Sequence, residues 1–154
     1  MTEPNPILGA GRGRRADQLP PAEARRIGRR LISSGGPWER AAGYSRAVVV
    51  GDGCWVSGTT DAGPDGRSRH PGDVAAQARA CLQTIDAALT KAGFSLADVV
   101  RTRMYVTDMG DGPAVIAVHG ELFGEIRPAA TLVAVAQLID DSLLVEIEAE
   151  AHRA

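Results

Sequence analysis

The hydrophobic pattern predicts strands in four parts of the chain. Two short apolar runs at 47–50 and 54–57 are rich in β-branched residues and flank Gly-Asp-Gly, which is typical of a β-hairpin. Residues 99–107 and 143–152 alternate in polarity, which predicts strands with one buried face, and 131–138 is also strand-like. In the 99–107 strand one face is predicted to hold Val100, Thr102, Met104 and Val106.

Two further segments have the spacing of amphipathic helices. Between 73 and 92, apolar residues recur every three or four positions behind Asp73, a favourable N-cap, and Gly93 ends the pattern. A second helix begins at Asp-Gly-Pro (111–113), and its buried stripe is Val115, Val118, Leu122 and Phe123. The order ββαβαββ predicts an α+β domain in which two helices cover one face of a mixed, mostly antiparallel sheet.

The first thirty residues differ from the rest in charge. They contain seven arginines and three acidic residues, whereas the whole chain has a formal net charge of −2. We interpret 1–30 as a basic, flexible N-terminal extension, with a short helix over 21–30, and 31–154 as the folded domain. A solvated tail is favoured over contact with RNA or a membrane surface.

The composition argues against several classes of function. The chain is 44% hydrophobic and 23% charged, and no apolar run approaches the about 18 residues of a membrane span or forms the core of a secretory signal. Cys54 and Cys81 lack a metal-ligand spacing, and His70, His119 and His152 are too scattered to suggest one. Phosphate-loop, dinucleotide and Gly-x-Ser-x-Gly motifs are absent. We therefore expect a cytoplasmic protein with no metal, no cofactor and no membrane partner.

Several motifs between residues 43 and 153 resemble the Rid (YjgF-like) family of reactive-intermediate deaminases, formerly called endoribonuclease L-PSP. They are Gly-Tyr-Ser-Arg-Ala-Val (43–48), Val-Ser-Gly (56–58), Asp-Val-Ala-Ala-Gln-Ala-Arg (73–79), Asp-Val-Val-Arg-Thr (98–102), Arg-Pro-Ala-Ala-Thr-Leu-Val (127–133) and Val-Glu-Ile-Glu-Ala (145–149). The resemblance implies a chorismate-mutase-like fold and a homotrimer whose sheets form a central barrel. It also implies a small-molecule cleft at each subunit interface.

One position departs from what this resemblance implies for catalysis. In deaminating members an arginine directly after the Pro-Ala of the signature binds the substrate carboxylate, and this chain has Ala130 there. A methyl group cannot replace that charge-assisted contact, which puts hydrolysis of 2-imino acids by the usual route in doubt. Arg127, Arg101 and Arg103 are candidate substitutes, with a solvated or ion-paired arginine as the alternative for each. Ile116 replaces an asparagine that active members often carry.

Other positions match the cleft of the family. Glu146 matches the glutamate that activates a water molecule, with a surface glutamate as the alternative. Tyr44 matches the tyrosine of the family's cleft, with packing in an interface as the alternative. Ser57 and Gly58 match the strand end whose backbone meets the ligand, with a simple strand terminus as the alternative. Trp38 lies outside the motifs of the family. We expect it to pack on a neighbouring subunit, with a lid over an apolar ligand as the alternative.

Three functional hypotheses remain. The first is a divergent Rid-type enzyme, a hydrolase or deaminase acting on C=N bonds, that converts a reactive imine, enamine or enol other than a standard 2-imino acid, with Glu146 as the base. The alternative is a non-catalytic ligand-binding or interaction module of the same fold. RNA binding through the Arg-rich extension is a weaker third hypothesis. The expected partners are a small molecule and further copies of the chain, with nucleic acid disfavoured.

Overall fold

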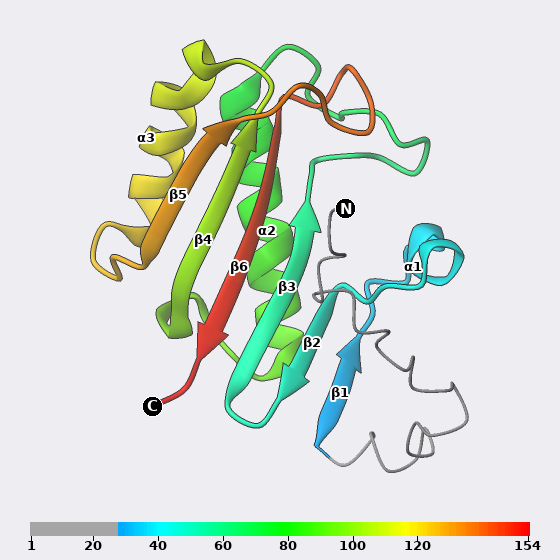
Figure 1. Cartoon of the computed structure of the whole chain (residues 1–154), viewed down its shortest axis with the longest axis vertical. Coiled ribbons are helices and arrows are strands. Elements are labelled where there is room, and N and C mark those ends of the chain that lie inside the picture. The colour runs from blue at the N-terminus through cyan, green and yellow to red at the C-terminus, as the bar shows by residue number, and fades with distance from the viewer. Residues whose placement is uncertain (1–27) are drawn as a thin grey trace, which may run out of the picture.

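Six strands form one mixed sheet in the order β1-β2-β3-β6-β4-β5 (Figure 1). The computed structural model describes residues 28–154. Its strands are β1 (Arg29–Ile32), β2 (Ala47–Val50), β3 (Gly53–Thr59), β4 (Val99–Val106), β5 (Ala129–Ala134) and β6 (Val145–His152). Only the β4–β5 pair is parallel; the other neighbouring strands are antiparallel. The predicted α+β class and mostly antiparallel sheet are therefore confirmed.

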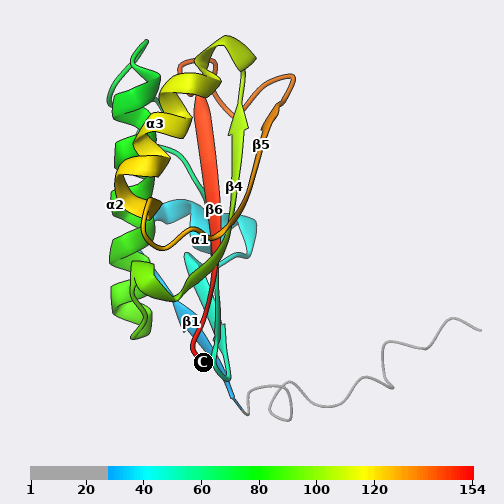
Figure 2. The same cartoon turned by 90° about the vertical axis from the view of Figure 1, so that its left-hand side faces the viewer.

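The two long helices lie on the same face of the sheet and leave the other face open (Figure 2). They are α2 (Val74–Ala92) and α3 (Gly112–Phe123); the shorter helices are α1 (Pro37–Ala42), η2 (Leu96–Asp98) and η3 (Met109–Asp111). The Asp73 carboxylate accepts a hydrogen bond from the backbone N–H of Ala76, which caps α2 as predicted. At the other end Gly93 has φ 81°, a left-handed conformation that favours glycine.

The hydrophobic core fills the space between the helical layer and the sheet. Its largest fully buried apolar side chains are Phe123, Leu82, Ile85, Leu89, Leu143, Ile147, Val106, Val115, Val118 and Val145. Each such side chain contributes roughly 1.5–3 kcal/mol when it leaves water. Most of these residues belong to the apolar stripes of α2, α3 and β6, so the period of the sequence explains why the three elements face one another.

The N-terminal part of the domain differs from the prediction. Arg29 and Arg30, expected at the end of a helix over 21–30, lie in β1 because their backbones pair with Val50 and Val49. The Arg30 side chain also donates a hydrogen bond to the Ala92 carbonyl at the end of α2. The rest of the expected helix, and the extension up to residue 27, lie outside the described residues.

Two strand predictions need correction. Val100 is 49% exposed rather than buried with Thr102, because the register with β6 shifts between Val99 and Arg101 and turns Val99 inward instead. In addition, β5 occupies 129–134 rather than 131–138, and residues 135–144 form the connection to β6.

Candidate functional site

The end of β3 contains an irregularity that brings two predicted site residues together. Val56 pairs with Ala149 and Thr59 with Ile147, so Ser57 and Gly58 occupy the length of a single residue on β6. A Cβ atom on Gly58 would lie 1.9 Å from Oε1 of Glu146. The Glu146 carboxylate therefore lies directly on the Gly58 backbone, where only glycine leaves room for it.

Glu146 is partly buried at this bulge. Burial raises the pKa of Glu146, the neighbouring charge of Glu148 raises it further, and Arg46 partly opposes both effects. A carboxyl group with a raised pKa takes up and releases protons closer to neutral pH than an ordinary glutamate does. This group is therefore suited to general acid–base chemistry.

Arg46 is held against the same bulge. Its Nη1 donates hydrogen bonds to the Gly58 carbonyl at 3.2 Å and to Oγ1 of Thr59 at 2.9 Å. Its Nε is buried and has no partner among residues 28–154. In the sequence Arg46 appears only as part of the 43–48 motif. Its position two residues after Tyr44 is the one sequence feature that links it to the site.

Hydrogen bonds join the segment before β2 to the end of β3. Oγ of Ser57 donates to the Ser45 carbonyl at 2.7 Å, and the Ser57 N–H donates to the Arg46 carbonyl at 3.0 Å. Ser57 is therefore occupied by backbone contacts and serves to align this segment. Tyr44 immediately precedes the segment and is 38% exposed.

Tyr44 lines a hollow of about 390 Å³ beside α1. The hollow is formed by Ser33, Gly35, Gly36, Glu39, Arg40 and Tyr44. Burial would raise the pKa of Glu39, but hydrogen bonds from Ser33 and Ser34 outweigh it and hold that pKa below its usual range. Trp38 is 57% exposed and does not line this hollow.

A smaller hollow, about 240 Å³, lies on the open face of the sheet. Arg103 contributes to its wall, and its Nη1 is 3.2 Å from a Glu148 carboxylate oxygen and 2.6 Å from one of Glu150. The Tyr105 hydroxyl donates a hydrogen bond to Glu148 at 2.9 Å. Arg103 is therefore ion-paired, which was the alternative to a ligand-binding role for this residue.

The predicted residues at the start of β5 lie away from Glu146 within one chain. Ala130 pairs with Thr102, whereas Glu146 pairs with Tyr105, three residues further along the sheet. Two strand spacings and three residues separate Ala130 from Glu146 by roughly 14 Å. Arg127 precedes β5 by two residues, on the side away from Glu146, with φ 55°.

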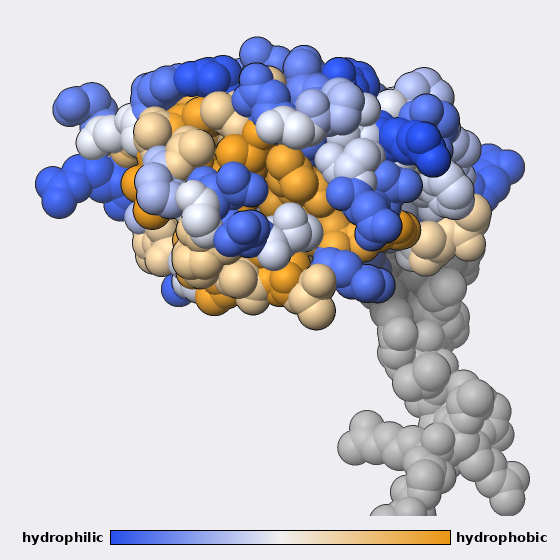
Figure 3. All heavy atoms as spheres, turned by 90° about the horizontal axis from the view of Figure 1, so that it is seen from above, coloured by the Kyte–Doolittle hydropathy of each residue, from blue (hydrophilic) through white to orange (hydrophobic). Residues whose placement is uncertain are grey.

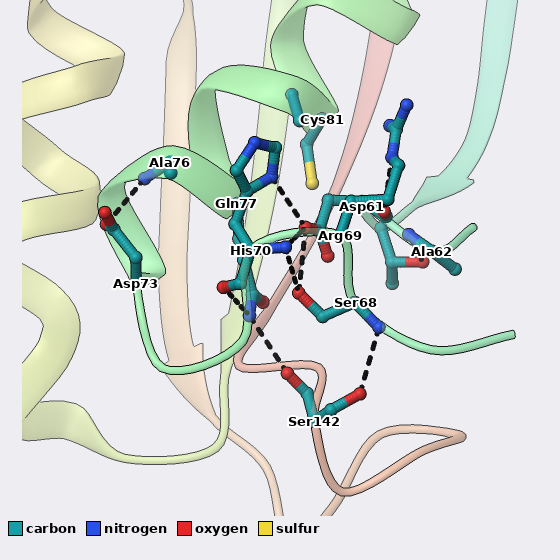
Figure 4. A network of polar contacts seen from close by, with 12 residues as sticks. Asp61, Ala62, Ser68, Arg69, His70, Asp73, Ala76, Gln77, Cys81 and Ser142 are labelled. Atoms are coloured by element: carbon teal, nitrogen blue, oxygen red, sulfur yellow. Dashed lines mark hydrogen bonds and ion pairs between the residues drawn. The ribbon is translucent and has the colours of Figure 1, made fainter.

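A buried network fixes the loop that follows β3 (Figure 4). Oδ2 of the fully buried Asp61 accepts hydrogen bonds from Oγ of Ser68 at 2.8 Å and the N–H of His70 at 3.0 Å, and lies 3.1 Å from Nδ1 of His70. Ser142 accepts at Oγ from the Ser68 N–H and at its carbonyl from the Gln77 side chain. This network ties the loop to α2 and to the segment before β6, and so supports the strand ends that hold Gly58 and Glu146.

The described part of the chain offers few groups for other chemistry. Within residues 28–154 no cluster of three or more His, Cys, Asp or Glu side chains is arranged to hold a metal ion. None of the helices in that range has the length and apolarity needed to cross a membrane. Both cysteines are buried and unpaired, and burial raises the pKa of Cys81 to about 12, so its thiol stays protonated near neutral pH.

Comparison with known proteins gives a consistent result. The family model described as endoribonuclease L-PSP matches residues 37–153. The solved structure of Rv2704 from Mycobacterium tuberculosis, a member of the YjgF/YER057c/UK114 family, is 49% identical with a TM-score of 0.74, covering 81% of this chain and 99% of that one.

Two relatives carry informative names. The 3-aminoacrylate deaminase RutC of Acinetobacter baylyi is 38% identical over 109 residues, or 71% of this chain and 86% of the relative. The structure of E. coli TdcF with bound serine is 30% identical with a TM-score of 0.65, covering 81% and 94% of the two chains. The chain therefore belongs to the endoribonuclease L-PSP family, also called the YjgF or Rid family.

Proposed function

We propose that this protein binds a small metabolite at the bulge of Gly58 and converts a reactive imine, enamine or enol there, with Glu146 as the proton-transferring group. The observation that carries this proposal is the partly buried Glu146 carboxylate, seated on the Gly58 backbone with a raised pKa. The name of the relative RutC, which describes deamination of an enamine acid, supports the reaction class.

The reaction follows from the position of one proton carrier. Glu146 takes a proton from a water molecule as the water oxygen bonds to the C=N carbon. The same group then returns the proton to nitrogen, which gives a carbinolamine. The hydroxyl proton of that intermediate moves to nitrogen as the C–N bond breaks, which releases a carbonyl compound and ammonia. An enamine first gains a proton on carbon and loses one from nitrogen, which gives the imine. A pKa raised by burial suits a group that must both accept and donate in one cycle.

We further propose that the site lies between copies of the chain in a homotrimer. Ala130 and Arg127 are too distant to meet a small ligand at Glu146 in the same chain, so these positions reach a site only through a second copy. The open sheet face supports association, because it exposes large apolar side chains that association would remove from water. These include Leu31, Val50, Trp55 and Val133.

A non-catalytic ligand-binding module is the second candidate. The methyl group of Ala130 favours it, because the guanidinium that clamps the substrate of deaminating relatives is missing there. The relative TdcF, solved with bound serine, shows that a protein of this fold holds a small amino acid. Such a module would keep the cleft and its ligand without any turnover.

Ammonia release from unstable imines separates these functions. We would generate 2-iminopropionate in place with an amino-acid oxidase, add a panel of other imines and enamines, and compare the wild type with Glu146→Gln and Ala130→Arg. For an enzyme we expect acceleration of at least one substrate, abolished in Glu146→Gln without loss of fold, and a gain on 2-iminopropionate in Ala130→Arg. A wild type that accelerates no substrate, and whose Ala130→Arg variant is equally inert, contradicts the enzymatic proposal and favours the binding module.

A further inference from the structure

Arg46 presents an unused hydrogen-bonding edge beside the candidate base. We propose that Arg46 binds the anionic group of the ligand, so that the ligand is anchored from the segment before β2 rather than from position 130. This inference rests on the proposed location of the site at Gly58 and Glu146. It assigns a specificity-determining role to a residue that the sequence motifs did not single out.

The free edge of Arg46 has the geometry that carboxylates recognise. Both of its hydrogen bonds, to the Gly58 carbonyl and to Oγ1 of Thr59, use Nη1. The remaining edge consists of Nε and Nη2, whose two N–H bonds are parallel and match the two oxygens of a carboxylate. Neither nitrogen has a partner among residues 28–154.

The buried Nε itself points to a missing acceptor. A buried N–H without a partner costs about 1–3 kcal/mol, which a folded chain rarely tolerates without a reason. An oxyanion at this edge would satisfy Nε and Nη2 together. Because Nε is closed to water in the isolated chain, an oxyanion completes this pair of bonds only when the side chains over Nε move aside.

The alternative cations are less suited to this role. Arg103 is already paired with Glu148 and Glu150 on the open sheet face. Within one chain Arg127 lies before the start of β5, further from Glu146 than Ala130 is, so only the Arg127 of a second copy can reach the site. Arg46 alone among these three arginines contacts the bulge on which the Glu146 carboxylate rests.

Because Arg46 lies close to Glu146, we also expect ligand binding to be accompanied by proton uptake. The charge of Arg46 holds down the pKa of Glu146, against burial and Glu148. An anion on Arg46 cancels that charge, so the pKa of Glu146 rises further when the ligand binds. Arg46 also helps to hold down the pKa of Glu39 on α1. Anion affinity should therefore increase as pH falls toward the pKa of Glu146, and in Glu146→Gln only the part that Glu39 supplies should remain.

The test compares two probes that differ in charge but hardly in shape, pyruvate and pyruvamide. Binding of each is measured by titration calorimetry to the full chain, with thermal unfolding as the check on folding. We expect the wild type to prefer pyruvate, and Arg46→Gln to lose roughly 10- to 100-fold in affinity for pyruvate with little change for pyruvamide. Arg46→Lys should recover part of the loss, since it restores the charge without the fork.

Arg79→Gln is the matched control, because Arg79 is an exposed arginine paired with Glu121 on the helical side. It should bind both probes like the wild type. Unchanged pyruvate affinity in Arg46→Gln, an equal loss for both probes, or no pyruvate binding by the wild type at tens of millimolar would each overturn the proposal. The outcome is separable from the proposed function: if Glu146→Gln keeps full turnover while Arg46→Gln loses pyruvate, the base is wrong and the anchor stands.

Discussion

The side chain of Glu146 on β6 leaves room only for glycine at position 58. Alanine there would place a methyl group 1.9 Å from the Glu146 carboxylate, which must then rotate away. We expect Gly58→Ala to lower the free energy of unfolding by about 1–3 kcal/mol and to abolish turnover. Glu146→Ala should relieve most of this loss in the double variant. Denaturant titration of both single variants and the double variant gives the coupling, and additive effects would contradict the contact.

His119 gives stability a definite dependence on pH. Its Nε2 lies 2.9 Å from Oγ1 of the fully buried Thr102, and burial lowers the pKa of His119. The unfolded chain therefore binds a proton at a higher pH than the folded chain, so stability falls as pH drops below about 6.5 and levels off below the folded pKa.

The measurement is thermal unfolding between pH 5 and pH 8, with His119→Gln as the comparison. We expect the wild type to lose more stability than the variant over the acidic part of this range. Equal slopes for the two proteins would show that His119 does not supply the dependence.

Arg127 holds a conformation that arginine rarely adopts. Its φ of 55° lies in the left-handed region, which costs a side chain about 1–2 kcal/mol and costs glycine little. We expect Arg127→Gly to stabilise the protein by about 0.5–1 kcal/mol, since added freedom in the unfolded chain offsets part of the gain. Denaturant unfolding tests this, and a destabilised variant would show that the Arg127 side chain makes a stronger contact.

Motifs in the sequence identified Glu146, Ser57 and Gly58, and the structure brings these three together. Arg46 and Asp61 were not identified, because their contacts depend on a bulge and on a loop of irregular backbone. Neither feature has a periodic signal in a single sequence. Residue types reveal a site when its chemistry is local, and they miss the contacts that cross between strands.

At the scale of elements, periodicity predicted the long helices and the paired strands. It missed β1 and α1 because each spans only four to six residues, too few to establish a period. The arginines of β1 also resemble a basic helix in isolation, and only pairing with β2 makes them a strand. The position of β5 was shifted because exposed edge residues do not alternate in polarity.

The Asp61 network is the element-scale feature whose loss should be most visible. Asp61→Ala removes the buried acceptor of the Ser68 hydroxyl and of the His70 N–H, and the His70 N–H keeps only its hydrogen bond to Oγ of Ser68. We expect a loss of roughly 2–4 kcal/mol in unfolding free energy and faster amide exchange over residues 60–72. Asp65→Ala, an exposed change in the same loop, is the control. Unchanged exchange in Asp61→Ala would show that the loop is held by other contacts.

Within residues 28–154, the long helices cover one side of the sheet and leave the other side uncovered. Seen from above, polar residues dominate over the helical layer, and apolar residues gather toward the open side of the sheet (Figure 3). Trp55, 47% exposed, lies on that open side. A single sheet that faces water normally carries polar side chains there, so this distribution favours self-association.

We expect the native protein to sediment with the mass of three chains and Trp55→Glu to dissociate it. The reason is that a buried charge without a partner disfavours the closed interface. Ala87→Glu, on the exposed side of α2, is the matched control and should leave the mass unchanged. Sedimentation at several concentrations makes the comparison, and a monomeric wild type would remove the intersubunit cleft from consideration.

The register of β6 also fixes the position of the C-terminus relative to the candidate site. His152 pairs with Gly53, and the Arg153 N–H donates to the Asp52 carbonyl, so the C-terminal end leaves beside the β2–β3 hairpin. Gly58 lies five residues further along β3, about 16 Å from that hairpin. A biosensor chip can therefore hold the protein by a C-terminal tag, because the tag leaves at the end of β3 opposite to Gly58.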